Sequence, residues 1–511
     1  MPIEVPEDAP IWNDTFEAKY VTRYLENYVD KHTYNGRSLR ERYMFDCRVD
    51  NVNRDGDLWT IEAKENRQSV TFTSRKLVIT TGLLSEEVMP SITGSDIFKG
   101  HLYHHKHFGR TGLINDPDMK DVTILGGGKS AADLVYAFAK AKRNISWVIR
   151  TTGTGAPLLT PSDGIGTCLN AAEVAMTRLS GILTPSPFIP YSWLQWFIHS
   201  SRLGESLLSA FFTQSESACT RPAEYNTRTD ALPGFSSLAP TTASLRWLVG
   251  NIGMITHADF WDVVARNVHI HRDTITRLHG HTAVLSSGAE LQTDLVVACT
   301  GYKSTLPFIS PTLKAHLGLP CPSTAIPPTT LTHWNSLEEK ADSAILSRFP
   351  FLASAPSANA PGIFPGPEAA GSQPYRLYRG VLSPNAPLIV VGHVLHGNHF
   401  MSAEVQALWG VAALSGALQL PEKEAMEKDI AAFVAWARRR YPAFRDTANS
   451  VVFEGMGYVD ALLREMGLTS HRGRGWWRDS VVPTLPRDLA GLVEEWRESC
   501  RKRRVSVEGD L

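Results

Sequence analysis

The sequence predicts an α/β protein built on a doubly wound parallel sheet. An apolar strand at Asp121–Leu125 is followed by a glycine-rich turn at Gly126–Ser130, a helix at Ala131–Lys142 and a strand at Ile145–Ile149. This strand–helix–strand order is the unit from which doubly wound sheets are built. Other segments have the uninterrupted apolar character of strands buried on both faces: 76–82, 294–301 and 388–392.

The remaining segments differ in their patterns. Apolar residues recur at helical spacing over Tyr20–His32, and three short strands are expected at 44–52, 59–63 and 69–72. Residues 151–250 form an insertion, in which a helix is expected at Leu169–Leu179. Proline-rich Ser310–Pro374 is expected to be dominated by loops, and the chain beyond Pro421 to be helical.

Composition limits the class of protein. A chain of 511 residues with 43% hydrophobic residues holds about two to four domains. The formal net charge of −1 argues against a nucleic-acid partner. The six cysteines form no Cys-x-x-Cys pair, so neither a redox dithiol nor a thiolate zinc site is indicated. Because so few cysteines in a long chain are typical of a reducing compartment, a cytoplasmic location is expected. The oligomeric state is left open.

The segment Leu179–Ser201 contains no Asp, Glu, Lys or Arg. Its prolines argue against a bilayer-spanning helix, because they remove backbone N–H groups. Trp193, Trp196 and Phe197 are expected to be buried or to line a pocket, with contact to a membrane surface as the alternative. The basic clusters 438–440 and 501–504 are expected to be solvated.

The glycine-rich turn predicts a dinucleotide site. In Gly126-x-Gly128-x-x-Ala131 the first glycine permits a tight turn and the second admits a pyrophosphate. Ala131 lets the helix pack closely on the strand, and Ser130 lies in the first helical turn, whose N–H groups attract phosphate. A purely structural glycine turn is the alternative.

The end of the second strand favours NADPH over NADH. NAD sites place an acidic residue there to accept from the ribose 2′-hydroxyl, but this strand ends at Arg150. A guanidinium can bind a 2′-phosphate through two hydrogen bonds. Arg150 as an ordinary surface charge is the alternative.

A histidine-rich run precedes the glycine turn. No carboxylate or cysteine close by completes a ligand set, so no metal is expected. The run instead fits F-x-G-x-x-x-H-x-x-x-F through Phe98, Gly100, His104 and Phe108. With it, the chain resembles the flavin-containing monooxygenases, a family that includes Baeyer–Villiger enzymes. The other matching landmarks are Thr81-Gly82, Met89-Pro90, Gly94, 298–302 and 402–409. The tail, through 438–442 and 458–462, is similar to a fungal secondary-metabolism branch.

The resemblance implies two dinucleotide-binding, Rossmann-like domains, with the NADPH domain inserted into the FAD domain. Thr81-Gly82 and Thr300-Gly301 would be the crossings and would contact cofactor, and His104 would hold the junction and the nicotinamide. A purely structural His104 is equally open. The expected parts are 1–118 and 298–420 of the FAD-type domain, 119–297 of the NADPH domain and a helical region at 421–511.

The implied reaction transfers one oxygen atom from O2 to a small organic substrate, with FAD and NADPH as cofactors. Phe108 leaves hydroxylation and Baeyer–Villiger oxidation both open, and no catalytic residue is assigned. The family's opening G-x-G-x-x-G turn has no counterpart upstream of Gly126, so we expect an N-terminally incomplete FAD domain and weak flavin binding. The alternatives are a non-catalytic NADPH-binding relative and a reductase, and the absent Cys-x-x-Cys argues against the latter.

Overall fold

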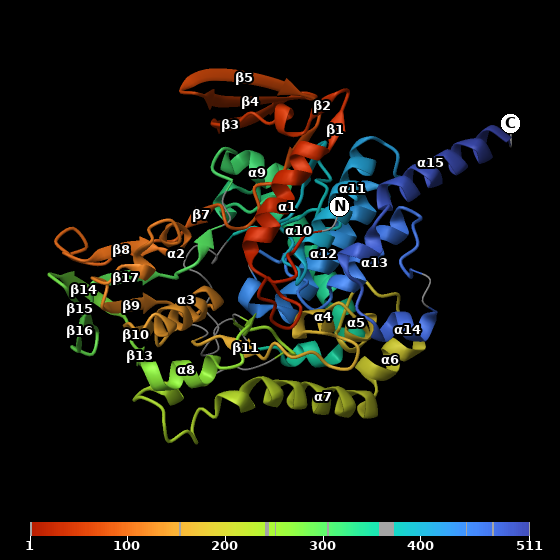
Figure 1. Cartoon of the computed structure of the whole chain (residues 1–511). Coiled ribbons are helices and arrows are strands. Elements are labelled where there is room, and N and C mark those ends of the chain that lie inside the picture. The colour runs from red at the N-terminus through yellow and green to blue at the C-terminus, as the bar shows by residue number, and fades with distance from the viewer. Residues whose placement is uncertain are drawn as a thin grey trace.

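A computed structural model describes residues 3–152, 155–240, 245–250, 252–303, 306–356, 372–445, 447–472 and 475–509. Its α/β architecture confirms the predicted fold class. The largest sheet has five strands, all parallel to their neighbours, and lies at the left in Figure 1. In spatial order its strands are β13 (Val268–Arg272), β10 (Asn144–Ile149), β9 (Asp121–Leu125), β17 (Leu295–Ala298) and β8 (His101–His104).

The two faces of this sheet have different covers. Helices α3 (Lys129–Lys140) and α8 (Phe260–Asn267) pack on one face, where Phe138 and Trp147 are almost fully buried. The other face carries Val148 and Val296. It packs against an antiparallel meander of β14 (Ile275–His279), β15 (Thr282–Leu285) and β16 (Glu290–Gln292). Successive side chains of a strand point to opposite faces of the sheet, and both faces are covered. The inner strands are therefore apolar along most of their length.

The five-stranded sheet draws residues from both sides of the boundary expected at residue 119. Strand β8 precedes that boundary, and β17 pairs with it in parallel from Leu295↔His101 to Ala298↔His104. Two short strands, β7 (Glu86–Glu87) and β18 (Tyr302–Lys303), form an antiparallel ribbon beside this sheet. The four-residue helix α2 (His105–Phe108) follows β8 directly.

A second region contains two small sheets. Strands β3 (Cys47–Asp55), β4 (Leu58–Glu65) and β5 (Gln68–Ser74) form an antiparallel sheet at the top of Figure 1. Strands β6 (Leu77–Ile79) and β19 (Leu388–Val390) pair in parallel. One apolar cluster, which includes Val52 and Trp59, joins both sheets. The N-terminal elements are α1 (Ala18–Lys31), β1 (Thr33–Tyr34) and β2 (Arg37–Ser38).

A helical body contains the largest apolar cluster, with Trp409 and Trp436 at 0% exposure. The expectation that 310–374 is mainly loops is wrong for its described part, because Pro311 and Pro328 stand in the first turns of helices. Proline is favoured there, since its missing N–H would be unpaired anyway. The helices are α9 (Pro311–Leu317), α10 (Pro328–Arg348), α11 (His399–Leu414), α12 (Lys423–Arg440), α13 (Gly455–Glu465), α14 (Trp476–Val481) and α15 (Leu492–Gly509).

The insertion contains short elements. The helix expected at 169–179 is two helices, because the side chain of Thr177 caps a new one by accepting from the N–H of Ser180. The elements are β11 (Leu158–Thr160), α4 (Ala171–Ala175), α5 (Arg178–Leu183), α6 (Trp193–Ser200), α7 (Arg202–Thr220) and β12 (Ile252–Met254). None of the helices in the described ranges has the length and apolar character that crossing a bilayer requires.

Two expectations about side chains are wrong. Trp193 and Trp196 are 72% and 47% exposed, because α6 turns toward the interior with Gln195 and His199 instead. Arg440, expected to be solvated, is fully buried with Glu454. Its guanidinium also donates to the carbonyls of Leu245 and Arg246, so it links the insertion to the helical body.

Replacing Arg440 should strongly destabilise the protein. Arg440→Leu leaves the buried Glu454 carboxylate without its ion pair, which costs about 3–5 kcal/mol. Arg439→Leu is the matched control, because the Arg439–Asp342 pair is partly exposed and contributes about 1 kcal/mol or less. The measurement is the free energy of unfolding in urea, and equal losses for the two variants would contradict the assignment.

Candidate dinucleotide-binding site

The carboxyl ends of the five parallel strands bring the predicted residues together. Gly126 follows β9, Arg150 follows β10, and His104 ends β8. Thr300 and Gly301 lie just beyond the end of β17. In open α/β sheets, ligands bind at this edge. The residues proposed to bind NADPH, and Thr300-Gly301 of the second predicted crossing, therefore lie at the carboxyl edge of the five-stranded sheet.

Gly126 occupies a position that only glycine can fill. Its φ is +125°, and a Cβ there would lie 2.3 Å from the carbonyl oxygen of Cys299. The N–H of Cys299 in turn donates to the carbonyl of Leu125 at 2.7 Å. The turn after β9 therefore packs directly on the backbone after β17, as a tight strand-to-helix turn requires.

The turn leads into the N-terminus of α3. Gly128 is the N-cap residue, with an extended backbone and no side chain to cap the helix. Ala131 is fully buried against the sheet, whereas Ser130 is exposed. Lys129 forms an ion pair with Asp133 one turn further on. The backbone N–H groups of the first turn and the helix dipole make this terminus suitable for a phosphate.

Arg272, which the sequence analysis missed, lies at the same edge. It pairs in register with Ile149, so the ends of β10 and β13 are adjacent. Its Nη1 is buried and has no hydrogen-bond partner, and burial lowers the pKa of its guanidinium. Both Nη1 and Nη2 lie 2.9 Å from where a Cβ at Gly155 would be, and the carbonyl of Gly155 lies close to Gly127. A partly buried guanidinium with an unused donor beside the glycine turn fits a phosphate group.

Arg150 is exposed at the end of β10, although partial burial lowers the pKa of its guanidinium. Arg150 follows the end of β10, and Arg272 ends the neighbouring parallel strand β13. The two arginines therefore belong to adjacent strand ends. A weak signal for Arg272 exists in the sequence, since it directly follows 268–271, where apolar and polar residues alternate as in a strand. The local sequence pattern does not show which strand pairs with β13, because that pairing joins segments far apart in the chain.

His104 connects the sheet to the second crossing. Its Nδ1 accepts from the N–H of Lys106 at 3.3 Å, so its Nε2 carries the proton and donates to the carbonyl of Gly301 at 3.1 Å. Desolvation by burial lowers the pKa of His104. The side chain of Thr300 donates to the carbonyl of Val88. Both ring nitrogens of His104 are therefore engaged, and the ring links the end of β8 to Gly301.

The rest of the histidine run also anchors the β7–β18 ribbon. Glu87 accepts from His107 at 2.9 Å and pairs with Lys106 at 3.3 Å, and these contacts lower the pKa of Glu87 to about 2. His105 contacts the hydroxyl of Tyr302 at 3.1 Å. Phe108 is buried against Phe138. No group of three His, Cys, Asp or Glu side chains suited to a metal ion occurs among the described residues.

The other predicted crossing lies at the carboxyl end of the β6–β19 pair. The N–H of Val391 donates to the carbonyl of Ile79, and Gly82 and Gly392 follow the two strands with φ of +68° and +79°. Thr81 is exposed. The amide oxygen of buried Gln406 accepts from the N–H of Gly392 at 3.0 Å. The Ser402–Trp409 signature therefore fixes the turn after β19.

Two buried histidines follow that turn. His393 and His396 are 2% and 3% exposed, and all four of their ring nitrogens are buried without a hydrogen-bond partner. Burial lowers the pKa of His393 to about 3 and that of His396 to about 4, so both rings are neutral near pH 7. Asn398 then caps α11 by accepting from the N–H of Met401. Unpartnered polar atoms at a strand end and a helix start are compatible with a polar ligand.

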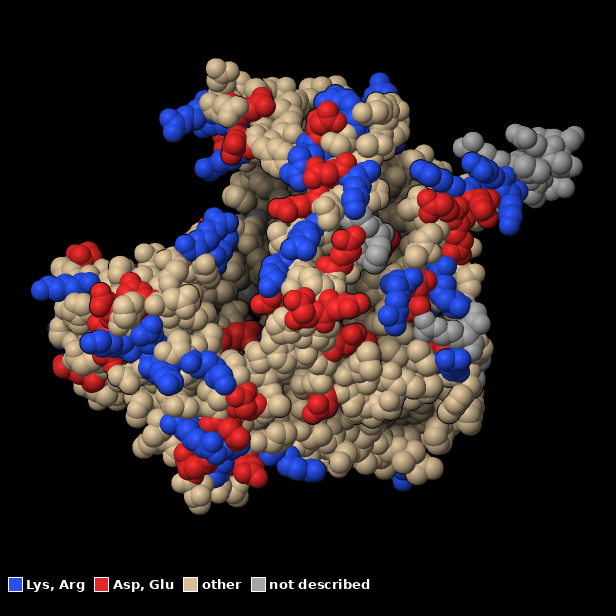
Figure 2. All heavy atoms as spheres, in the orientation of Figure 1, with Lys and Arg blue, Asp and Glu red and all other residues tan. Residues whose placement is uncertain are grey.

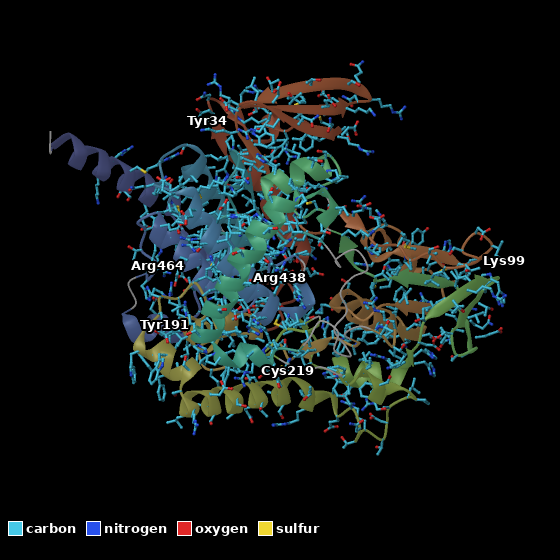
Figure 3. The ribbon with its side chains drawn as sticks, turned by 180° about the vertical axis from the view of Figure 1, so that it is seen from behind. Tyr34, Lys99, Tyr191, Cys219, Arg438 and Arg464 are labelled. Carbon is cyan, nitrogen blue, oxygen red and sulfur yellow. The ribbon has the colours of Figure 1, made fainter. Side chains whose placement is uncertain are left out.

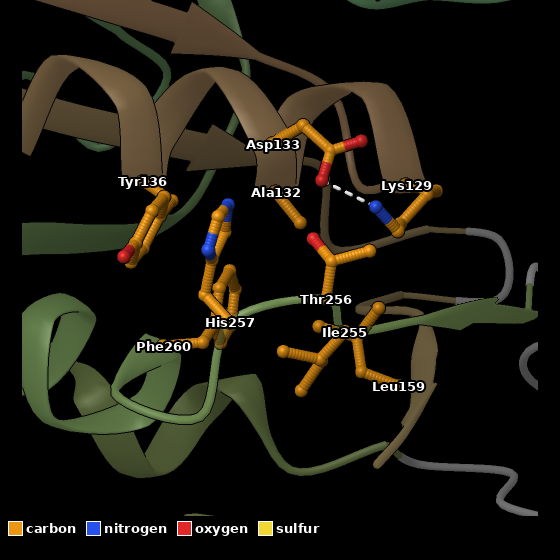
Figure 4. Close-up of a pocket in the computed structure, with 9 residues that line it drawn as sticks. All are labelled: Lys129, Ala132, Asp133, Tyr136, Leu159, Ile255, Thr256, His257 and Phe260. Carbon is orange, nitrogen blue, oxygen red and sulfur yellow. Dashed lines mark hydrogen bonds and ion pairs between the residues drawn. The ribbon is translucent and has the colours of Figure 1, made fainter. Parts of the chain in front are cut away.

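A small pocket, partly open to solvent, lies along the outer side of α3 (Figure 4). Tyr136 and His257 stack there with ring centroids 4.5 Å apart, and the Tyr136 hydroxyl donates to Asp259. The Lys129–Asp133 ion pair forms its end nearest the glycine turn. The pocket thus extends from the N-terminus of α3 along the helix.

Residues 13–158 match the L-lysine 6-monooxygenase/L-ornithine 5-monooxygenase family. The FAD-dependent monooxygenase resA of Aspergillus sclerotiorum is 31% identical over 93% of this chain and 84% of its own length. An FAD-dependent monooxygenase of Pyrenophora dematioidea is 32% identical over 88% of this chain and 84% of its own length.

Two solved structures share the fold. Cyclohexanone monooxygenase bound to ε-caprolactone has a TM-score of 0.53 at 14% identity, over 89% of this chain and 84% of that one. Steroid monooxygenase bound to NADP has a TM-score of 0.50 at 17% identity, over 88% of this chain and 83% of that one. The fold of the flavin monooxygenases, with two dinucleotide-binding domains, is thereby shown. From the sequence relatives, the chain belongs to the family of FAD-dependent monooxygenases.

Proposed function

We propose that this chain is an FAD- and NADPH-dependent monooxygenase that transfers one oxygen atom from O2 to a small organic substrate. The observation that carries the proposal is the buried, unpartnered Nη1 of Arg272 beside the glycine turn. Family membership supports the flavin chemistry. Similarity of the C-terminal region to the fungal secondary-metabolism branch supports a natural-product substrate, and the six free cysteines support a cytoplasmic setting.

NADPH would lie across the carboxyl edge of the five-stranded sheet. Its pyrophosphate would approach Gly126 and Gly128 and the N-terminus of α3, with Ser130 and Ala131 in the first turn. Arg150 and Arg272 would bind the 2′-phosphate from the ends of β10 and β13. No acidic residue takes the position that binds a ribose 2′-hydroxyl in NAD sites, which favours NADPH.

FAD would lie at the end of the β6–β19 pair, where Thr81, Gly82 and Gly392 leave an open edge. We assign this edge to the FAD-type domain (1–118 and 298–420) and the five-stranded sheet to the NADPH domain, with β8 as its contribution from before residue 119. When bound, the flavin supplies the redox and oxygen chemistry. The protein contributes binding and orientation, and the His104–Gly301 contact fixes the segment after β17 against the end of β8.

Charge reversal at Arg150 should erase the preference for NADPH. We expect Arg150→Asp and Arg272→Met each to weaken NADPH binding by about 1–3 kcal/mol and to leave NADH nearly unchanged, because only NADPH has the 2′-phosphate. Arg277→Met is the control, since Arg277 is an exposed arginine on β14. Titration of both nucleotides gives the dissociation constants, and equal constants for NADPH and NADH in the parent protein would refute the assignment.

Gly128→Val should abolish nucleotide binding and leave the fold intact. The φ of Gly128 is −104°, which valine adopts, but the branched side chain would occupy the approach of the pyrophosphate. Gly126→Ala should instead destabilise the protein, since its Cβ would collide with the Cys299 carbonyl. Thermal unfolding and NADPH titration of both variants separate the two effects. Tight NADPH binding by Gly128→Val would place the site elsewhere.

The buried histidines should make stability fall in acid. Their folded pKa values of about 3 and about 4 lie below the usual 6.5, so the unfolded chain binds more protons below pH 6.5. Their contribution is complete above pH 6.5 and is lost toward pH 4, at about 1.4 kcal/mol per pH unit for each residue. His396→Gln should reduce this slope in urea unfolding from pH 7 to 4.5. Exposed His316→Gln should keep it, and a parental slope in His396→Gln would contradict the assignment.

A further inference from the structure

The α6–α7 hairpin has an exposed apolar surface, which we call the hairpin face. Seven large apolar side chains of this segment are between 37% and 72% exposed. They are Tyr191, Trp193, Leu194, Trp196, Leu203, Leu207 and Phe211. A single exposed apolar residue is ordinary, but a set this large on two packed helices indicates an interaction surface.

The pattern along α7 separates two faces of the helix. Leu203, Leu207 and Phe211 recur at intervals of four residues on the exposed side, while Leu208 and Phe212 are buried on the other. The helix therefore has its own core contact and a second apolar stripe. It forms the lower edge of the molecule in Figure 1, and its ends lie near Tyr191 and at Cys219 in the rear view of Figure 3.

The hairpin is held rigidly. A Cβ at Gly204 would lie 2.0 Å from the carbonyl oxygen of Phe197, so the two helices approach closely at their junction. Trp193 stacks on Phe197 with centroids 5.7 Å apart. Arg348 donates to the carbonyls of Ser186 and Ile189 and lies over the ring of Tyr191. The exposed rings are thus presented in fixed positions.

The acids of α7 have partners in the insertion, whereas the arginines at its two ends are exposed. Glu205 forms an ion pair with Arg246, and Glu216 accepts from the N–H of Leu245, so both acids of α7 are engaged by the insertion. Arg202 and Arg221, at the two ends of α7, are exposed. Figure 2 shows little charge along the lower edge over α7. The hairpin face is therefore apolar in the middle and cationic at its ends.

We propose that the hairpin face docks the protein on an anionic lipid surface. Tryptophan and tyrosine prefer the boundary between headgroups and acyl chains, because their rings are apolar and their N–H or O–H remains hydrated. A helix parallel to the membrane buries an apolar stripe while its cations meet anionic headgroups. Arg202 and Arg221 supply that complementarity, and the engaged acids remove the repulsion. Surface docking is compatible with the lack of a spanning helix among the described residues.

A second copy of this chain is the competing occupant. Two such faces meeting around a twofold axis would bring the same cations together, while both acids of α7 are already engaged within each copy. Like charges across an interface cost free energy, whereas anionic headgroups stabilise both arginines. The charge pattern therefore favours lipid over self-association.

The test is co-sedimentation of the full chain with vesicles. One set of vesicles is pure phosphatidylcholine, and the other contains 30% phosphatidylserine, whose anionic headgroups attract arginine. We expect binding to the anionic vesicles, at least about tenfold weaker binding to neutral ones, and a further loss of about tenfold or more in Trp193→Ser/Trp196→Ser. Leu207→Ser/Phe211→Ser should lose binding in the same way.

Ile97→Ser is the matched control, since Ile97 is 61% exposed on a different part of the chain and should bind vesicles as the parent does. Intact folding of each variant is checked by its unfolding midpoint. Equal sedimentation of parent and hairpin variants, or no sedimentation of the parent with anionic vesicles, overturns the proposal. A dimer in size-exclusion chromatography that the hairpin variants convert to a monomer overturns it in favour of a second copy.

Discussion

The contact of Gly126 with the Cys299 carbonyl is the constraint on which the site depends. A Cβ at Gly126 would lie 2.3 Å from that oxygen, so β9 and β17 can end side by side only if the residue after β9 is glycine. Their parallel pairing then aligns the glycine turn, the ends of β10 and β13, and Thr300-Gly301 on one edge. His104 can reach Gly301 only because β8 pairs with β17 in that same direction.

Sequence patterns predict the fold where local periodicity and packing agree. Strand β9 has the expected bounds, and α3 and β10 begin within two residues of theirs, because the apolar runs and the glycine turn act over short distances. Sequence patterns fail at Pro311 and Pro328. A proline-rich segment predicts loops, but each of these prolines stands in the first turn of a helix. They also fail at Arg440, since a buried ion pair requires Glu454, which the local pattern around Arg440 does not include.

The residues of the candidate site are likewise predictable from sequence only where they belong to a local motif. Gly126, Gly128 and Arg150 follow from a motif in one strand–helix–strand unit, whereas Arg272 depends on the register between Ile149 and Arg272, more than a hundred residues apart in sequence. The unpartnered His393 and His396 are invisible to sequence because burial, rather than spacing, distinguishes them. Trp193 and Trp196 show the opposite error. The absence of charged residues in their segment predicts that these rings are buried, but both are exposed.

In the proposed site, Arg150 and Arg272 at one sheet edge recognise the 2′-phosphate, and the binding of adenosine 2′,5′-bisphosphate tests this role without flavin or catalysis. Calorimetric titration against adenosine 5′-monophosphate compares ligands that differ only in that phosphate. We expect the bisphosphate to bind at least about tenfold more tightly, a difference of about 1.4 kcal/mol, and this advantage to disappear in Arg272→Met. Equal affinities of the parent protein for the two nucleotides would contradict this role.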